Sequence, residues 1–394
     1  MKKNDPQTSA QPLEDLVLLS HKIGRESLED AADNDAVHLF PEKTLEQIIS
    51  AKLLTAAIPS KYGGLNLGLV KGSSLALLKI LKHIGSGNLV MGRVLEGHIN
   101  AQLLIHQFGT KKQQQHFAKE AFNNHLFGVW NTQADDGTHL KFSKKGKIHL
   151  KGSKIFATGI DYVSRPLVTA ARPDGSWQMA VVPLDEMETT VDNSWWNPMG
   201  MRSSRSYKIT FKDSQIPMKN LLGKPGNYYE QPSFSGGAVR FAAIQLGGAE
   251  RLFDETRKYL QNLGRIDDAY QQMRLAQMAV AVASGNHWLA SAAEKMDGYL
   301  AVPTVENSGK LLAHVNMMRT AIESIGTEVI SLCQKSVGAR GLNKPFHFER
   351  MIRDLSTYLR QPAPDASLAE VGKYVLENKI PANDLWEMAI KNKQ

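Results

Sequence analysis

The spacing of apolar residues changes twice along the chain, and this change constrains the fold more than any other feature. From Leu13 to about residue 122, apolar residues recur at steps of three and four, which predicts helices. Between residues 126 and 223 the period becomes two, in short runs separated by Gly, Pro, Asp and Ser, which predicts antiparallel strands. From Val239 onward the helical spacing returns. The sequence therefore predicts an α+β fold in which a small sheet lies between two helical units.

These changes of period divide the chain into three expected domains. We place a helical domain at residues 1–124, a β domain at 125–229 and a second helical domain at 230–394. The composition step near residues 220–229 marks the second boundary. A chain of 394 residues fits two or three packing units, because a single core stops growing at roughly 250–300 residues.

Composition excludes several classes of protein. With 42% apolar and 22% charged residues the chain suits an ordinary packed core, and its single cysteine excludes an intrachain disulfide. The net charge of +8 is diffuse, so we expect an anionic small molecule rather than nucleic acid as the partner. No apolar stretch reaches the ~18 residues that span a bilayer, and none suits a signal peptide. We therefore expect a cytoplasmic protein without a membrane partner.

Common nucleotide, metal and hydrolase motifs are absent from the sequence. There is no GxGxxG after a predicted strand, no GxxxxGK[ST], no HExxH and no GxSxG. The histidines are scattered at spacings that do not suit a metal, which indicates surface residues or core residues with hydrogen-bond partners. We predict no metal site.

Two short segments offer side chains that suit a flat ligand. The segment 130–138 follows the first predicted strand with Trp, Asn, Thr and Gly, where backbone amides can approach a ligand closely. The segment 154–159 ends a strand with an aromatic residue, a Thr and a Gly, and an aromatic ring stacks on planar heterocycles. A surface turn and a packed strand end explain the same letters, so both interpretations stay open on these residues alone.

Taken in order, several segments resemble the acyl-CoA dehydrogenase family of flavoproteins over nearly the whole chain. The segments at residues 132–139, 154–159, 199–204 and 349–354 stand, in this order, where the family carries TEPxAGSD, K-x-W-I-T-N/G, LGMRGS and E-x-x-x-RD. The segments are IPSKYGG (58–64), QFGTKKQQQHF (107–117), TQADDGTH (132–139), KIFATG (154–159), MGMRSS (199–204), FKDSQIPMKNLLG (211–223), VGARGL (337–342) and ERMIRD (349–354).

The resemblance implies a helical domain, a β-barrel-like middle domain and a four-helix C-terminal bundle. It also implies FAD between the middle domain and the bundle, with the adenosine end completed by a neighbouring subunit of a homodimer or homotetramer. In this sequence, Thr158 is then expected near flavin N5, and Phe156 replaces a tryptophan of the family. The residues expected to line the isoalloxazine are Trp130, Asn131, Thr132, Phe156 and Thr158.

The same resemblance assigns residues to the phosphate groups. Gly137 and Thr138 are expected on the phosphate side of the cofactor or substrate. Gly338 and Ala339 are expected to approach the FAD pyrophosphate of a partner subunit, because small side chains let backbone amides reach phosphate oxygens. The family's RxxFG segment is missing, and Arg265 is the residue that could replace its arginine.

The family's catalytic glutamate has no counterpart here. In the family it abstracts the α-proton of an acyl thioester, but the aligned position is Pro362, and the alternative position near residues 237–239 has no carboxylate either. Asp365 lies three residues beyond Pro362 and is our candidate base, if the intervening turn folds inward. Alternatively, Asp365 caps the helix predicted after it.

Three functions are consistent with these residues. The first is an FAD-dependent dehydrogenation of an acyl-CoA thioester in fatty acid metabolism, with Asp365 as base and an electron-transfer flavoprotein as acceptor. The second is a monooxygenase of the same fold, since such enzymes lack the glutamate and receive reduced flavin from a reductase. The third is a ligand-binding homologue that has lost catalysis.

Overall fold

Helices, then strands, then helices follow one another along the chain, which confirms the predicted α+β fold. The structure is a computed structural model that describes residues 7–143, 147–360, 363–382 and 384–389. The first helices are α1 (Gln7–Val37), α2 (Glu42–Ser50), α3 (Ser74–Gly87), α4 (Leu89–Phe108) and α5 (Lys111–Phe122). The last are α6 (Ala238–Asn262), α7 (Ala269–Ala301), α8 (Val305–Gly341), α9 (Phe348–Tyr358) and α10 (Pro364–Glu377).

The strands between them form one sheet. They are β1 (Leu126–Trp130), β2 (His139–Phe142), β3 (Ile148–Ala157), β4 (Val163–Ala171), β5 (Trp177–Val181), β6 (Thr189–Asp192), β7 (Tyr207–Ile216) and β8 (Leu221–Leu222). The strand order is β6-β7-β3-β2-β4-β5-β8, and β1 pairs with β4 outside this path.

The expectation of a purely antiparallel sheet is wrong at β4, which has two parallel neighbours. Strand β1 pairs with β4 in parallel, with Val129 opposite Leu167, and β2 meets β4 in parallel through a single pair. The β2–β3 hairpin lies between β1 and β4 in the sequence and supplies the long connection that parallel neighbours require. The remaining pairs are antiparallel.

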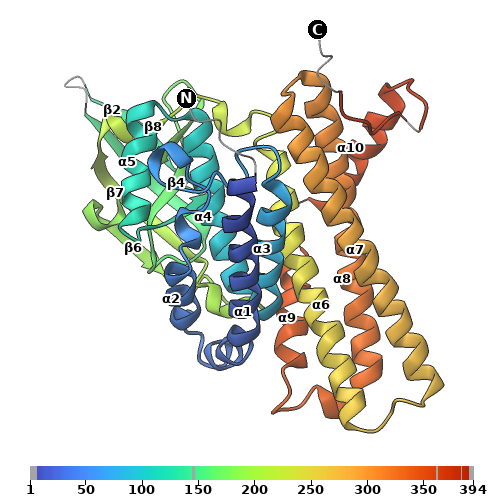
Figure 1. Ribbon diagram of the computed structural model, residues 1–394. Helices are drawn as coiled ribbons and strands as arrows, with labels where there is room; N and C mark the ends of the chain where they lie inside the picture. Colours follow the sequence, from blue (N-terminus) through green and yellow to red (C-terminus); the bar gives the residue numbers. More distant parts are fainter. Residues whose placement is uncertain (1–6, 144–146, 361–362, 383, 390–394) are drawn as a thin grey trace.

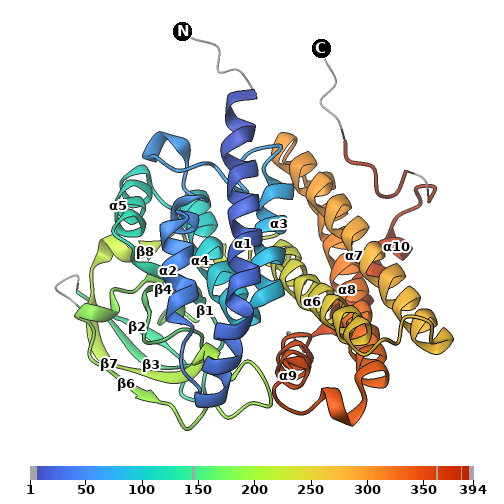
Figure 2. The ribbon, with the colours of Figure 1, turned by 60° about the horizontal axis from the view of Figure 1, so that its bottom comes forward.

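Helices α1, α3 and α4 separate the sheet from the long C-terminal helices (Figures 1 and 2). Helix α4 packs on β1, while α3 packs on α6. The approach of α3 to α6 requires glycine, because a Cβ at Gly247 would lie 2.1 Å from the carbonyl oxygen of Lys82. The Lys82 ammonium also donates to Glu250 on α6 (2.9 Å) and to Asn286 on α7 (2.8 Å). A single cluster of buried apolar residues also runs from α1 and α3 to α6 and α8, and so joins both helical parts.

Three long helices, α6, α7 and α8, pack together at the C-terminal side, with α9 against α6 and α10 against α8 (Figure 1). Helix α8 kinks near its end, where Gly338 adopts a φ of +58°. No helix in the described part of the chain combines the length and the apolar character that crossing a bilayer requires.

The MGMRSS turn joins the sheet to α9. A Cβ at Gly200 would lie 2.1 Å from the carbonyl oxygen of Arg353, so only glycine fits at this approach. The backbone N–H of Met201 donates to the buried carboxylate of Asp354 (2.6 Å). Arg353 in turn pairs with Asp35 on α1 (2.6 Å). These contacts fix α9 against both the sheet and the first helix.

Candidate functional site

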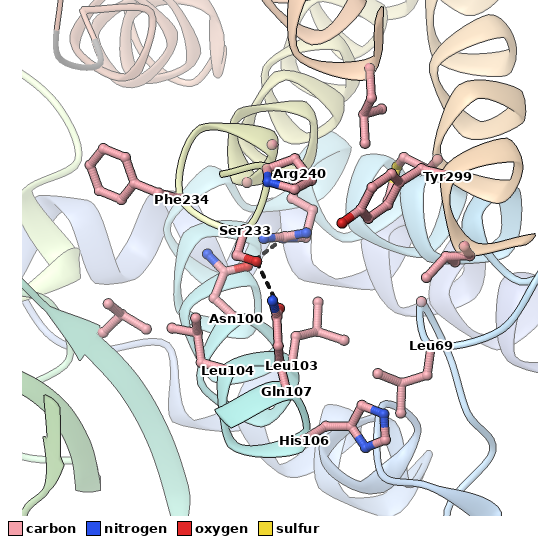
Figure 3. Close-up of a pocket in the computed structure, with 18 of the residues that line it drawn as sticks. Leu69, Asn100, Leu103, Leu104, His106, Gln107, Ser233, Phe234, Arg240 and Tyr299 are labelled. Atoms are coloured by element: carbon pink, nitrogen blue, oxygen red, sulfur yellow. Dashed lines mark hydrogen bonds between the residues drawn. The ribbon is translucent and has the colours of Figure 1, made fainter. Parts of the chain in front are cut away.

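A cavity of about 450 Å³ lies where α4, α6 and the end of α7 meet. Its wall is mostly apolar, with a few polar groups that point inward (Figure 3). We call it the α4–α6 cavity; its principal residues are Leu69, Asn100, Leu103, Leu104, His106, Gln107, Val129, Tyr228, Ser233, Arg240, Met296, Tyr299, Leu300 and Leu311. The volume suits a small organic ligand.

Helix α4 provides one side of the cavity. The side chain of Asn88 caps its start by accepting from the N–H of Met91 (3.1 Å). Asn100, Leu104 and Gln107 follow at steps of four and three residues, which places them on one face of the helix. The opposite wall begins with Arg240, in the first turn of α6.

A polar network lies behind this wall. The carboxylate of Glu96, which is 2% exposed, accepts from Arg93 and from the Asn100 amide (2.5 Å). The other end of Asn100, its Oδ1, accepts from Nε of Arg240. Two guanidinium groups therefore share the neighbourhood of one carboxylate, and burial lowers the pKa of Arg240.

The segment 227–237 closes the cavity toward the sheet. The Ser233 hydroxyl donates to Oε1 of Gln107 (2.8 Å; Figure 3), and the Tyr229 hydroxyl donates to Oδ1 of Asn131 (3.3 Å). The rings of Tyr228, Tyr229 and Phe234 pack edge to face with centroids 5.1–5.4 Å apart. This aromatic segment lies over the end of β1, beside the residues predicted to contact the flavin ring.

The structure brings part of that predicted set together. Thr132 and Phe156 are exposed, and Thr158 is half-buried with its hydroxyl 3.0 Å from the Ser206 hydroxyl. Trp130 is only 1% exposed, and its indole N–H donates to the Thr158 carbonyl (3.2 Å). Trp130 therefore supports this face from behind, since its ring is buried in the core. The contacts with flavin stay predictions.

Phe156 is an exposed aromatic residue near the end of β3. It is 47% exposed, and its φ of +56° is a conformation that aromatic residues rarely adopt. Its ring packs edge-on against Trp195 (4.9 Å) and Trp196 (5.9 Å). Sequence reasoning missed both tryptophans, although the pair stands next to the MGMRSS segment.

Asn131 is held by a buried lysine that sequence reasoning also missed. The Lys154 ammonium donates to the Asn131 carbonyl (2.8 Å) and to the Thr169 hydroxyl (3.0 Å), and the lysine side chain is fully buried. Burial lowers the pKa of Lys154 to about 7. The Thr169 hydroxyl in turn donates to Oδ1 of Asn131 (2.7 Å), so both ends of this residue are fixed.

The two residues predicted on the phosphate side lie next to each other but differ in access. Gly137 is half-buried with a φ of +26°, at the turn before β2. Thr138 is fully buried: its hydroxyl donates to the Thr169 carbonyl (2.7 Å), and its N–H donates to Oε1 of Gln133 (2.8 Å). Thr138 thus orders the turn, and a phosphate contact of this pair stays a prediction that rests on Gly137.

The three residues predicted for the partner's cofactor lie at one end of the bundle, away from the α4–α6 cavity. Arg265 is exposed in the α6–α7 connection, and Gly338 and Ala339 are exposed at the α8 kink. The Arg274 guanidinium donates to the Lys335 carbonyl (3.2 Å) and ties the two regions together. A Cβ at Gly338 would meet nothing within 4 Å, so open space lies beside it.

Asp365 is exposed in the first turn of α10 and does not line the α4–α6 cavity. The alternative that it caps α10 is not what the structure shows, because Ala363 is the N-cap residue and no side chain caps it. Its carboxylate stands where a helix dipole favours negative charge. Pro362 lies outside the described residues, and the role of Asp365 as base stays a prediction.

Arg240 and Tyr299 are the cavity residues that sequence reasoning overlooked as binding groups. Both point into the cavity from different helices (Figure 3). Within the described ranges, no group of three or more His, Cys, Asp or Glu residues is arranged to hold a metal ion.

Comparison with known proteins identifies the family to which this architecture belongs. Residues 20–124 match the acyl-CoA dehydrogenase N-terminal domain, and residues 226–359 match the C-terminal domain of the same family. The chain belongs to the acyl-CoA dehydrogenase family. The sequence-based recognition is therefore confirmed.

Its relatives differ in activity. A dibenzothiophene monooxygenase of Mycolicibacterium goodii is 22% identical over 374 residues, covering 85% of this chain and 87% of the relative. A probable acyl-CoA dehydrogenase of Bacillus subtilis is 27% identical over 334 residues, covering 80% and 84%. The FMN-bound structure of TdsC, a dibenzothiophene monooxygenase from Paenibacillus sp. A11-2, has a TM-score of 0.84 at 19% identity, covering 95% of this chain and all of TdsC. That likeness shows a shared fold.

Proposed function

We propose that this protein is a flavin-dependent monooxygenase that acts on a small organic substrate in the α4–α6 cavity. The observation that carries this proposal is the composition of the wall: among the described residues, no aspartate or glutamate lines the cavity. Dehydrogenation of an acyl thioester needs a base within hydrogen-bond reach of the α-proton. Oxygenation needs none, so the cavity as built suits it better.

The surface beside the cavity fits a flavin. Phe156, backed by Trp195, offers an uncovered aromatic face of the kind that contacts a flat heterocycle. Asn131 and Thr132 lie at the adjacent end of β1, which reaches the cavity through Val129. These residues would hold the ring, and the open space at Gly338 would admit a phosphate of a partner's cofactor.

Reduced flavin would supply two electrons, with which one atom of O₂ enters the substrate and the other leaves as water. The chain's own residues then have three tasks. The aromatic segment around Tyr228 and Phe234 keeps water from the site. Asn131, fixed by Lys154, presents its polar groups in one orientation, and the leucines of α4 bind the apolar part of the substrate.

The remaining expectations about partners are part of this proposal. A flavin reductase would supply reduced cofactor. The outward face of α7 suits self-association into a dimer or tetramer, because its exposed residues carry no charge from Met273 to Ala290. The face consists of Met273, Ala276, Gln277, Ala279, Val280, Ala283, Ser284, His287 and Ala290.

The test begins with purified protein and added flavin. We expect tight binding of reduced flavin, and oxygen consumption that depends on both a reductase and a small aromatic or sulfur-containing substrate. Anaerobic bleaching of bound flavin by an acyl-CoA, with no oxygenated product under air, would refute the proposal in favour of the dehydrogenase.

Dehydrogenation is the second candidate, and the probable acyl-CoA dehydrogenase of Bacillus subtilis supports it. It makes a distinct prediction about Asp365. If acyl-CoA bleaches the flavin, Asp365→Asn should abolish that bleaching at unchanged flavin content. Unaltered bleaching in this variant would exclude Asp365 as the base.

A further inference from the structure

The α4–α6 cavity has more positive than negative charge around it. Within the described residues, Arg240 forms no ion pair, and its Nε donates to the neutral amide of Asn100. Glu96, the carboxylate whose charge acts on Arg240, already accepts from Arg93 through one oxygen and from Asn100 through the other. Arg240 therefore adds a positive charge to a mostly apolar wall, and no carboxylate of the described residues forms an ion pair with it.

We propose that the α4–α6 cavity binds an organic monoanion, a carboxylate or sulfinate with an apolar body, whose charged head is held by Arg240 and Tyr299. This inference rests on the proposed function, since it names the substrate class of the same site. Arg240 is the residue that selects the charge, and the leucines of α4 receive the body.

Desolvation is the first reason for this assignment. A guanidinium removed from water is destabilising unless an anion or several acceptors compensate it. Arg240 is half-buried and has one amide acceptor, and burial lowers its pKa although Glu96 opposes this shift. Because arginine stays protonated in proteins, the charge is relieved by bringing in an anion rather than by losing a proton.

The space around the guanidinium is the second reason. Gly236 and Gly237 line the cavity next to Arg240. A Cβ on Gly237 would lie 3.0 Å from Nη2 of Arg240, which is tighter than ordinary contact. The lack of a side chain at Gly237 therefore leaves room beside Nη2 of Arg240. From there the guanidinium can offer two parallel N–H groups to both oxygens of a carboxylate.

The position of Tyr299 is the third reason. Its hydroxyl points into the cavity from the end of α7 (Figure 3), and burial raises its pKa, so it is a hydrogen-bond donor at neutral pH. Leu103, Leu104 and Leu300 form the apolar part of the wall. Within the described residues, no carboxylate lines this wall, and the one behind it, Glu96, accepts from Arg93 and Asn100.

Binding of hexanoate and of its neutral counterpart hexanamide tests the assignment. Both are titrated by calorimetry into the full-length protein, once without flavin and once after reconstitution with flavin. Hydrogen bonds to charged groups contribute about 1.5–3 kcal/mol, so hexanoate should bind about 10- to 100-fold more tightly than hexanamide.

Three variants assign that preference to Arg240. Arg240→Met should abolish it, while Arg240→Lys should keep part of it. Arg257→Met is the matched control, because Arg257 lies on the same helix, is exposed and pairs with Asp254; the preference should be unchanged there. Equal affinities for the two probes in the wild-type protein would overturn the inference, even if Arg240→Met does not fold. So would a preference that survives in a folded Arg240→Met protein.

Flavin affinity, measured separately by fluorescence quenching, keeps the two proposals apart. A protein that binds no flavin but prefers hexanoate would refute the proposed function and support the anion site. A protein that binds flavin but treats both probes alike would refute the anion site alone.

Discussion

Acidification should destabilise this protein through His98, an imidazole of α4 with no exposed surface. Its Nε2 lies 2.7 Å from the carbonyl oxygen of Leu54, and its Nδ1 lies 3.0 Å from the backbone nitrogen of Phe127. Both contacts are hydrogen bonds only if Nε2 carries the proton and Nδ1 accepts. A proton on Nδ1 would face the N–H of Phe127.

The magnitude follows from the pKa. Burial lowers the pKa of His98 from 6.5 to about 4, whereas the unfolded chain titrates at the ordinary value. Between these values the unfolded chain binds a proton that the folded protein does not. The contribution to stability is therefore complete above pH 6.5 and is lost as the pH falls toward 4. It amounts to about 3 kcal/mol, at about 1.4 kcal/mol for each tenfold change in proton concentration.

Urea unfolding of wild type and His98→Asn, at several pH values between 7 and 4, measures this contribution. The variant should be less stable at neutral pH, because it loses contacts, but its stability should fall less steeply with acid by about 1.4 kcal/mol per pH unit. His116→Asn, at a partly exposed histidine of α5, is the control and should keep the wild-type slope. Equal slopes for wild type and His98→Asn would refute the reasoning.

Three further changes test the packing, the cofactor site and the assembly. Gly200→Ala should cost about 1–3 kcal/mol in urea unfolding, because its Cβ would lie 2.1 Å from the Arg353 carbonyl oxygen; Gly372→Ala, where a Cβ meets open space within α10, should be neutral or stabilising. Gly338→Trp should yield folded protein that lacks flavin, measured as the ratio of flavin to protein, and a stoichiometric ratio would contradict the predicted pyrophosphate contact. Val280→Glu should lower the mass measured by light scattering, because it places a charge on the uncharged face of α7; an unchanged oligomer would exclude that face as an interface.

The order of elements was predictable because apolar period is a local property. The stripe that begins at Val239 buries one side of α6, and the alternation from Ile148 onward buries one side of β3. The parallel pairing of β1 with β4 was not predictable in this way. It depends on which strands meet after the β2–β3 hairpin folds back, and period does not encode such a long-range contact.

The site was harder to predict, because its residues come from separate elements. Thr132 and Phe156 stand within recognisable segments, so the resemblance could point to them. Arg240 carries no local signal: it is one arginine on an amphipathic helix, and only the fold places Asn100 and Tyr299 near it. Arg240 matters because it forms no ion pair within the described residues, and a sequence does not show which charges are paired.

The lack of a carboxylate on the described wall of the α4–α6 cavity and the positive charge of Arg240 are related. A dehydrogenase of this family needs a carboxylate next to its substrate, and an apolar wall with a nearby arginine would hold that carboxylate ionised. Here the arginine is present and, in the described part of the wall, the carboxylate is not. If the substrate itself brings the anion, the electrostatic balance of the cavity is restored by binding rather than by a residue. A neutral acyl chain would leave Arg240 without an anionic partner in the cavity. The charge selection that we propose and the lack of a carboxylate on the described part of the wall therefore both favour the proposed monooxygenase.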